Sequence, residues 1–303
     1  MRLDIFTKLA QGPSSAEEVA ERCGGDARAF GVFLDALTGI GLVEKRHGRF
    51  SNTPFAQRHL VEGGEDYRGD QLVFDDRSWD LWGRLEETLM SGSPGMAKTV
   101  FESSSEAAER LLLGLHRDAL SIAPGLAERL PLGDCEQLLD VGGGAGTYAV
   151  AFCRHFPKLR ATIFDLPMGA RLARLTVREA GMSDRIQVIE GNFLKDPLPR
   201  PYDAVFASNV LHSNGPDENR QLLRRVADCL TPGGIIVVRD ILMNDELTQP
   251  VFGSVFSVNM LLHTPLGRCY AQSEIFEWLA EAGFVQAETV EPESVITAVK
   301  PRG

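Results

Sequence analysis

The sequence predicts an α/β fold in which a doubly wound, Rossmann-like sheet follows a helical N-terminal domain of winged-helix character. Two observations support this prediction. From residue 137 onward, short apolar strands alternate with amphipathic helices, whereas the pattern before residue 137 is mainly helical. The length agrees, because 303 residues are typical of two domains rather than one.

The first 60 residues follow a helix–helix–hairpin order. The segment Ser14–Glu18 is typical of a helix start, because a serine caps free N–H groups and early acids suit the N-terminus. A second helix is expected from Asp26 to Gly41, with its apolar residues at helical spacing. A small hairpin with its turn at His47-Gly48 follows. This order is typical of winged-helix domains.

Two further helical stretches are expected before the sheet. In the first, Trp79, Trp82, Leu85 and Leu89 lie at spacings of three and four, which places them on one face of one helix. The second is expected from about Ser104 to Leu130.

The sheet is expected to contain parallel strands with an antiparallel pair at one edge. Between the strands lie helical patterns, of which Asp217–Leu230 is the clearest. The expected parallel strands are Gln137–Val141, Ala161–Phe164, Arg185–Ile189, Ala204–Ser208 and Ile235–Val238, and the late pair is Gln286–Val290 with Val295–Val299.

Composition excludes several classes of protein. Apolar residues make up 44% and charged residues 24%, which is ordinary globular composition. No apolar run approaches the roughly 18–20 residues that cross a bilayer, and no signal pattern opens the chain, so we expect a cytoplasmic protein. A net charge of −11 disfavours nucleic-acid binding. The five scattered cysteines predict neither a disulfide framework nor a zinc site, and we expect no metal.

The strongest local signal is the segment Leu138–Thr147, where a strand ends in a glycine-rich turn and a helix begins. Gly142, Gly144 and Gly146 let the backbone approach a ligand, because no Cβ is in the way. In an open α/β sheet such a turn lies at the carboxyl end of a strand, where ligands bind. Asp140 is expected directly beneath this loop.

Two further strand ends indicate a nucleoside. Asp165 ends the next strand, before Leu166, and a carboxylate there accepts both hydrogen bonds of a ribose diol. The amide of Asn192 is suited to an adenine edge, and Phe193 is suited to stacking on the ring. Ser208, at the end of the fourth strand, is the remaining candidate for cofactor binding.

The identity of the nucleoside follows from the charge beside the loop. The segment Gly144–Ala149 fits the dinucleotide fingerprint G-x-G-x-x-G/A, but a dinucleotide site holds a pyrophosphate. Asp140 is a poor neighbour for phosphates, whereas a carboxylate suits the amino group or sulfonium of S-adenosylmethionine. We therefore favour S-adenosylmethionine, with a dinucleotide site or a glycine turn without a ligand as alternatives.

Taken together, these motifs resemble the class I S-adenosylmethionine-dependent O-methyltransferases of the plant caffeate and isoflavone type. Relatives of that family include bacterial phenazine, polyketide and carotenoid O-methyltransferases and the acetylserotonin methyltransferase. The resemblance covers nearly the whole chain, and it rests on Leu139–Gly146, Phe164–Pro167, Asn209–His212, Leu230–Gly234, Ala282–Phe284 and the segment Leu42–Pro54.

The resemblance implies a domain division and a homodimer. Residues 1–98 are expected to form a helical, winged-helix-like dimerisation domain, and residues 99–303 a methyltransferase domain in which 99–133 are connecting helices. The helix that would contact DNA, Ala27 to Ile40, has Arg28 as its only cation, although DNA recognition needs several. We therefore expect dimerisation through this domain and no nucleic acid or membrane as a partner.

His212 is the candidate general base. It follows the fourth strand at the mouth of the same crevice, and the resemblance implies that this position holds the catalytic histidine. A neutral hydroxyl is a poor nucleophile, so a base assists its attack on a methyl group. A free imidazole titrates near about pH 6.5 and accepts a proton at neutral pH. An orienting or structural role for His212 is the alternative.

The plant enzymes flank this histidine with two acids. One matching position here is Cys269, which cannot do that work, and the other falls near Arg239-Asp240. Asp240 is therefore the second catalytic candidate. An aspartate also commonly occurs where Asn192 stands in this chain.

The resemblance implies a small-molecule acceptor, aromatic or polyketide-like, and places Met260 and His263 at pocket positions. His116, in the helix expected before the sheet, is a third candidate. The alternative is core packing for Met260 and a core or surface position for His116. Methylation of nitrogen or sulfur, a non-methylating reaction on a retained cofactor, and a regulatory scaffold are the alternative functions.

Overall fold

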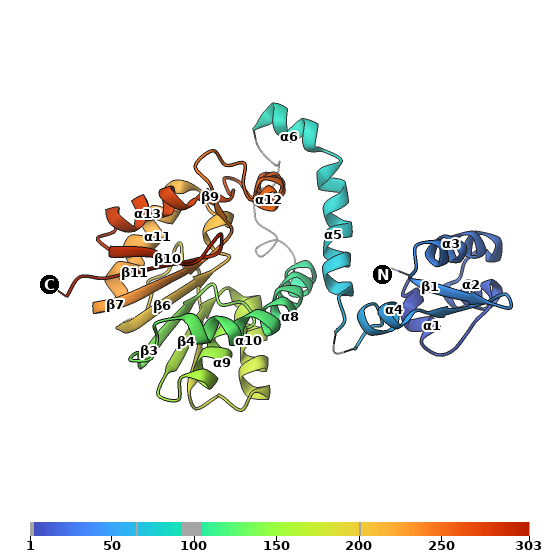
Figure 1. Ribbon diagram of the computed structural model, residues 1–303, viewed down its shortest axis with the longest axis horizontal. Coiled ribbons are helices and arrows are strands. Elements are labelled where there is room, and N and C mark those ends of the chain that lie inside the picture. The colour runs from blue at the N-terminus through green and yellow to red at the C-terminus, as the bar shows by residue number, and fades with distance from the viewer. Residues whose placement is uncertain (1–2, 65, 93–104, 200, 303) are drawn as a thin grey trace. The chain divides into compact units, whose positions relative to one another are not determined.

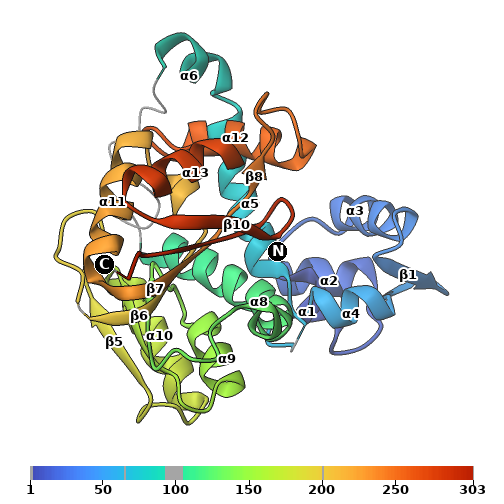
Figure 2. The same cartoon turned by 60° about the vertical axis from the view of Figure 1, so that its left-hand side comes forward.

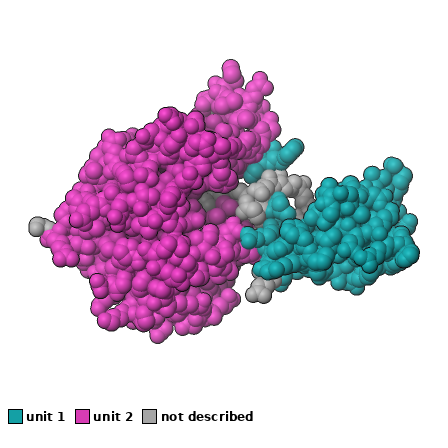
Figure 3. Space-filling model, in the orientation of Figure 1, with its two compact units in different colours: residues 1–79 teal, residues 80–303 magenta. Residues whose placement is uncertain are grey.

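The computed structural model describes residues 3–64, 66–92, 105–199 and 201–302. The chain forms two compact units, Met1–Trp79 and Asp80–Gly303, which Figure 3 shows in different colours. The predicted domain boundary between residues 98 and 99 lies outside the described residues. The division into residues 1–98 and 99–303 therefore stays a prediction.

The first unit has the predicted helix–helix–hairpin order. Ser15 caps its helix through the Glu18 N–H, and Glu18 bonds back to the Ser15 N–H, which is a capping box. Asp26 caps the next helix through the Ala29 N–H. The elements are α1 (Ile5–Leu9), α2 (Ala16–Cys23), α3 (Ala27–Gly39), β1 (Val43–Arg46), β2 (Arg49–Asn52) and α4 (Pro54–His59).

The predicted single helix over residues 79–89 is wrong, because two helices occur there. Helix α5 (Gly69–Trp82) ends before Gly83, and α6 (Leu85–Ser91) begins after it. Glycine is a poor helix residue, since it loses much backbone freedom on ordering. Leu89 is 64% exposed, so the expected apolar stripe is not a buried face.

The second unit is built on a seven-stranded sheet of order β10-β11-β7-β6-β3-β4-β5 (Figure 1). The five strands from β7 to the β5 edge are parallel, and β11 is antiparallel to both β7 and β10, which confirms the predicted edge pair. The strands are β3 (Gln137–Val141), β4 (Arg160–Asp165), β5 (Ile186–Glu190), β6 (Tyr202–Ser208), β7 (Leu230–Arg239), β10 (Val285–Glu291) and β11 (Val295–Val299).

Helices cover both faces of this sheet (Figures 1 and 2). Helices α8 (Ser105–Arg129), α9 (Thr147–His155) and α10 (Pro167–Glu179) cover one face, and α11 (Pro216–Cys229) and α13 (Gln272–Glu281) cover the other. The remaining elements are the 3₁₀ turn η1 (Leu211–Ser213), β8 (Leu242–Met243), α12 (Val251–His263) and β9 (Tyr270–Ala271).

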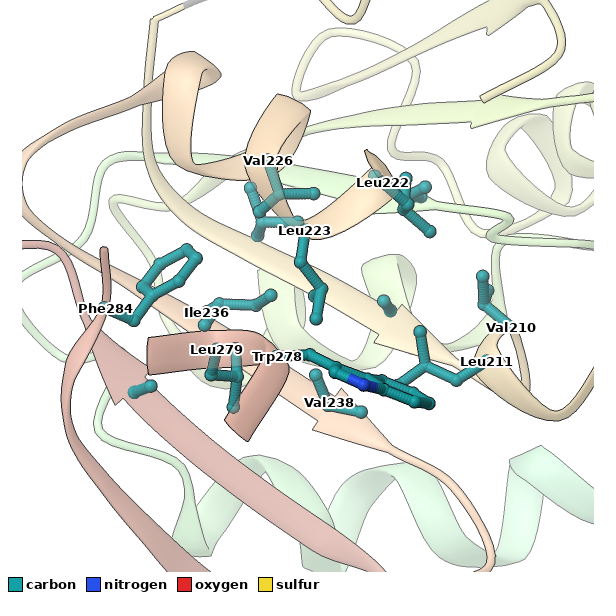
Figure 4. Packing of buried hydrophobic residues seen from close by; sticks show 14 of the residues in the cluster. Val210, Leu211, Leu222, Leu223, Val226, Ile236, Val238, Trp278, Leu279 and Phe284 are labelled. Atoms are coloured by element: carbon teal, nitrogen blue, oxygen red, sulfur yellow. The ribbon is translucent and has the colours of Figure 1, made fainter. Parts of the chain in front are cut away.

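Alternation along the strands divides the core into two layers. Leu138, Phe206 and Val237 pack with α9 and α10, whereas their neighbours Leu139 and Val238 pack with α11 and α13. Figure 4 shows the second layer, where Trp278 and Leu279 of α13 meet the apolar side chains of α11 and β7. Side chains at the carboxyl ends of the strands follow the same rule, which decides the face of each polar group in the site.

Two further predictions concern the cysteines and membrane-spanning segments. All five cysteines are free thiols, and four of them are buried. In the part of the chain that the structure describes, no helix is long and apolar enough to cross a membrane.

Candidate active site

The glycine loop connects β3 to α9, as predicted. Gly142, Gly144 and Gly146 have φ values of 66°, 55° and 76°, which L side chains rarely adopt. A Cβ on Gly142 would lie 2.9 Å from Val210 Cγ2 and 3.4 Å from the Phe193 ring. The loop therefore needs glycine for its backbone conformation and for its close approach to the next loops.

Asp140 lies beneath this loop, as expected. Its side chain is buried, and a Cβ on Gly143 would come 2.7 Å from its carboxyl group. Its Oδ2 atom has no hydrogen-bond partner among the residues that the structure describes. Burial, with a contribution from the nearby Asp165, raises the pKa of Asp140 to about 8. The group is therefore mainly protonated at neutral pH and ionises when a cation is placed beside it.

Asp165 ends β4 and joins it to the loop. Its Oδ2 accepts the Gly144 N–H at 2.6 Å, and its Oδ1 accepts the Leu166 N–H at 2.6 Å. Burial raises the pKa of Asp165 to about 6, so it is mainly a carboxylate at neutral pH. Each oxygen keeps a second lone pair, which is the arrangement that a ribose diol requires.

Asn192 and Phe193 form the turn after β5. The Asn192 Oδ1 atom, which was expected to face an adenine amine, accepts the Leu194 N–H at 2.9 Å. The Asn192 backbone N–H donates to Asp196 Oδ2 at 2.7 Å. The side chain of Asn192 therefore stabilises the turn that places the Phe193 ring beside Gly142.

Ser208 ends β6 on the α9 face of the sheet. Its hydroxyl accepts a long hydrogen bond of 3.4 Å from Arg239 Nη1, and the Arg239 guanidinium lies 5.6 Å from the centroid of the Tyr148 ring. Ser208 thus lies in a polar cluster next to the first turn of α9, which follows the glycine loop.

His212 and Asp240 form a buried pair. His212 Nδ1 lies 2.6 Å from Asp240 Oδ1, and their side chains are 9% and 3% exposed. Asp240 Oδ2 also accepts the N–H groups of Leu211 and His212, at 3.1 and 3.2 Å. Burial opposes ionisation, but the His212 imidazole and the N–H groups of Ile241 and His212 together hold the pKa of Asp240 below its usual value. A carboxylate on Nδ1 leaves Nε2 as the proton-accepting nitrogen.

Two buried amides hold the turn that carries His212. Asn214 donates to the Val210 carbonyl at 3.0 Å, and Asn219 donates to the Leu211 carbonyl at 3.0 Å. Cys269, the other family position beside the histidine, is buried, and burial raises the pKa of its thiol to about 11. Asp240 is therefore the acid on His212 in this chain.

Helix α12 packs on the His212 turn and carries two of the predicted substrate residues. Met260 and His263 are buried, and His263 Nδ1 donates to the Asn259 carbonyl at 2.8 Å. One turn before Met260, the Phe256 ring lies edge-on to the His212 ring, with centroids 5.2 Å apart. Sequence reasoning missed Phe256, although its spacing of four from Met260 would have placed both on one helix face.

His116 lies elsewhere in the site. Its Nδ1 atom is 2.6 Å from the Thr147 hydroxyl, so α8 is tied to the first residue of α9 beside the glycine loop. Burial lowers the pKa of His116, with a smaller contribution from Arg117. This histidine is placed with the cofactor loop, whereas Met260 and His263 are placed with the His212 turn.

Comparison with known proteins identifies the family. A model of the O-methyltransferase domain matches residues 92–285, and a model of the O-methyltransferase dimerisation domain matches residues 1–62. The chain belongs to this O-methyltransferase family. It therefore contains the family's dimerisation domain and uses the cofactor S-adenosylmethionine.

Similar proteins act on several acceptors. The chain is 35% identical to the 3-hydroxy-5-methyl-1-naphthoate 3-O-methyltransferase of Streptomyces sahachiroi, over 94% of this chain and 84% of that protein. It is 33% identical to the N,N-dimethyltransferase OxyT of Streptomyces rimosus, over 99% and 91%. Human N-acetylserotonin methyltransferase, solved in complex with S-adenosylmethionine, is 25% identical with a TM-score of 0.85, over 99% and 91%.

The site fits this cofactor. The unpartnered Oδ2 of Asp140 lies beneath a loop in which an added Cβ would clash, so a cationic group and a close backbone approach are both accommodated. The Asp165 carboxylate offers the ribose acceptors at the neighbouring strand end. Among the residues that the structure describes, no three His, Cys, Asp or Glu side chains are grouped to hold a metal ion.

Proposed function

We propose that this enzyme transfers a methyl group to a hydroxyl of a small aromatic or polyketide-like molecule, with His212 as the general base. The observation that supports the proposal is the 2.6 Å contact between His212 Nδ1 and Asp240 Oδ1. It lies in the loop after β6, at the same edge of the sheet as the glycine loop.

Asp240 supplies orientation rather than proton transfer. By accepting the Nδ1 proton, its carboxylate selects the tautomer in which Nε2 is unprotonated, and it stabilises the imidazolium that forms. Nε2 then takes the proton of the acceptor hydroxyl as that oxygen attacks. Phe256 holds the ring from its other side and restricts its rotation.

The cofactor, when bound, supplies an electrophilic methyl group on a sulfonium. We propose that Asp140, Gly142, Gly144, Gly146, Asp165, Leu166, Asn192, Phe193 and Ser208 hold it. Their task is alignment, because a displacement of this kind depends mainly on the geometry of the reacting atoms. Asp165 positions the nucleoside of the cofactor, and Asp140, beneath the loop, lies beside its cationic methionine part.

The proposed acceptor site is the face of α12 that packs on the His212 turn, with Phe256, Met260 and His263 as lining residues. Two apolar side chains and one histidine suit a flat, largely apolar ring with a few polar substituents. The naphthoate acceptor named for the Streptomyces sahachiroi relative is a ring of this kind. His116 is proposed to bind the acceptor from the α8 side.

We also propose a homodimer formed through the first unit. Helix α3 exposes Val32 and Phe33 by 63% and 47%, and its C-cap residue Ile40 is 70% exposed. Exposed apolar side chains gathered on one helix indicate a protein interface. Light scattering at micromolar concentration tests this, with Val32→Glu/Phe33→Glu expected to shift the mass to that of a monomer.

The decisive experiment measures release of S-adenosylhomocysteine from labelled S-adenosylmethionine over a panel of phenols, hydroxy acids, amines and thiols. Turnover of a phenol is expected for the wild type and is expected to collapse in His212→Ala. The surface variant His155→Ala is the matched control. Unchanged S-adenosylhomocysteine binding by His212→Ala shows that the variant is folded, and full turnover of the phenol by it would refute the base assignment.

A second candidate function is N-methylation, which the similarity to an N,N-dimethyltransferase favours. A neutral amine nitrogen is a far better nucleophile than a neutral hydroxyl oxygen. It therefore does not need a base to remove a proton before it attacks. Turnover restricted to amines and retained in His212→Ala would select this alternative.

A further inference from the structure

Three polar side chains lie at the carboxyl ends of three neighbouring strands. Asp140 is on β3, Ser208 on β6 and Arg239 on β7, and β6 pairs with both other strands. Asp140 lies two residues after Leu138, Ser208 two after Phe206 and Arg239 two after Val237, and side chains two residues apart in a strand point to the same face. Leu138, Phe206 and Val237 share the core layer beneath α9. All three polar side chains therefore lie on the α9 face, whereas Asp240 points to the opposite face, toward His212.

The guanidinium of Arg239 lies over the ring of Tyr148, in the first turn of the helix that follows the glycine loop. It lies 5.6 Å from the centroid of the Tyr148 ring, and Tyr148 is the second residue of α9. Its Nη1 atom is 3.4 Å from both Ser208 Oγ and Asn209 Oδ1, at the end of β6. Asp140 acts electrostatically on the same tyrosine. The cation and the acid are thus both close to Tyr148, in the first turn of α9.

Arg239 has only weak partners in this position. Both oxygens that it contacts are neutral and at the long limit for a hydrogen bond. Within the described ranges it forms no ion pair with a carboxylate, although its side chain is half-buried. A desolvated guanidinium without an anion is costly, and its planar fork matches a carboxylate. This arrangement indicates an anionic ligand group at the end of β6.

We infer that Arg239 binds the α-carboxylate of the methionine part of S-adenosylmethionine, with Ser208 and Asn209 completing the subsite. This rests on the proposed placement of the cofactor in the glycine loop. The methionine part carries one ammonium and one carboxylate, and the strand ends offer one acid and one guanidinium. The two complementary charges orient the tail, with its ammonium toward Asp140 and its carboxylate toward β7.

Calorimetric binding of two product analogues tests this assignment without turnover. One is S-adenosylhomocysteine, and the other is its decarboxylated form, which keeps the amine and the nucleoside. For the wild type, S-adenosylhomocysteine is expected to bind about tenfold or more tightly than the decarboxylated form, because a charge-assisted bond to Arg239 is lost. In Arg239→Met the two ligands are expected to bind within about twofold of each other.

The controls separate this result from misfolding. Binding of the decarboxylated ligand by Arg239→Met at wild-type strength shows an intact site, and Arg239→Lys is expected to restore part of the preference. Arg160→Met removes an exposed cation at the amino end of β4 and is expected to keep the full preference.

Two results would overturn the inference. One is an equal loss of affinity for both ligands in Arg239→Met. The other is unchanged affinity for S-adenosylhomocysteine together with a higher KM for acidic acceptors than for their methyl esters, which would assign Arg239 to a carboxylate of the acceptor. Either result leaves the proposed methyl transfer standing, because that proposal is tested by turnover in His212→Ala.

Discussion

His212 Nδ1 lies 2.6 Å from Asp240 Oδ1, and both side chains are buried. The pair joins the loop after β6 to the end of β7. Asp240 accepts backbone N–H groups in addition to the imidazole, so the carboxylate is held in place before any ligand binds. The imidazole is thereby fixed in orientation and tautomer, and this property leads to the first prediction.

Asp240→Asn is expected to lower kcat by roughly 100-fold or more, with a small effect on KM. The amide keeps the size of the side chain, but it does not hold the Nδ1–H tautomer of His212. Steady-state kinetics on a phenolic acceptor measures the effect. Affinity for S-adenosylhomocysteine is expected to stay within about twofold of the wild type, since Asp240 faces away from the cofactor loop. A parallel loss of kcat and product affinity would contradict this role.

The stability of the cofactor-free protein is expected to fall as pH rises toward 9, in part because of Asp140. Its pKa is raised to about 8 in the folded state. Its contribution is therefore complete below the usual aspartate pKa of about 4, and it is lost as pH rises through about 8. Asp140→Asn removes this dependence, because the amide does not ionise.

Denaturant unfolding at pH 5 and pH 9 measures that difference. Relative to the wild type, Asp140→Asn is expected to gain roughly 4 kcal/mol between the two values. Asp165, with a pKa of about 6, has the same sign and contributes mainly below pH 7 in both proteins. A constant difference between wild type and variant across this range would refute the raised pKa.

Gly267→Ala is expected to destabilise the protein by about 1–3 kcal/mol and to lower kcat. A Cβ there would lie 2.3 Å from the His212 carbonyl oxygen and 2.5 Å from Thr264 Oγ1, so the His212 turn must shift. Thermal unfolding and kinetics measure the two effects. Gly133→Ala is the control, because a Cβ at that position has no neighbour within 4 Å. Equal unfolding temperatures and equal kcat values for the two variants would show that the structure accommodates the added methyl group at residue 267 without loss.

Phe256→Ala is expected to lower kcat by about tenfold and to raise KM for the acceptor, because the ring both packs edge-on to His212 and lines the proposed acceptor site. Phe252→Ala is the matched control. The Phe252 ring stacks on Phe256 but is 67% exposed, and its loss is expected to change kcat by less than about twofold. Indistinguishable kinetics of the two variants would remove Phe256 from the site.

Much of the fold could be predicted from the sequence because each strand is short, apolar and bounded by turn residues. The strand Gln137–Val141 and the edge strand Val295–Val299 were predicted with the bounds that the structure has. The break between α5 and α6 was missed, since the spacing of Trp79, Trp82, Leu85 and Leu89 continues across Gly83 as if the helix did. Periodicity alone does not show whether an apolar stripe is buried.

The site could be predicted only in part, because local motifs show position in the chain and not direction in space. The glycine loop and Asp165 were found from strand–turn–helix patterns. The proposed roles of Arg239 and Phe256 were not predicted, since neither belongs to a motif and their contacts, with Tyr148 and His212, are distant in sequence. The predicted role of the Asn192 side chain at adenine stays a prediction, and the structure adds that its Oδ1 atom accepts the Leu194 N–H.

The sequence by itself determined the α/β fold, the glycine loop and the family, because these depend on local patterns of apolar, glycine and acidic residues. Only the tertiary structure decided that Asp240 is the partner of His212. The parallel register of β6 and β7 pairs Ser208 with Arg239, which brings residues 212 and 240 to one edge of the sheet. Strand alternation then turns Asp240 toward His212 and Arg239 toward α9, so the side chains of two adjacent residues lie on opposite faces of the sheet.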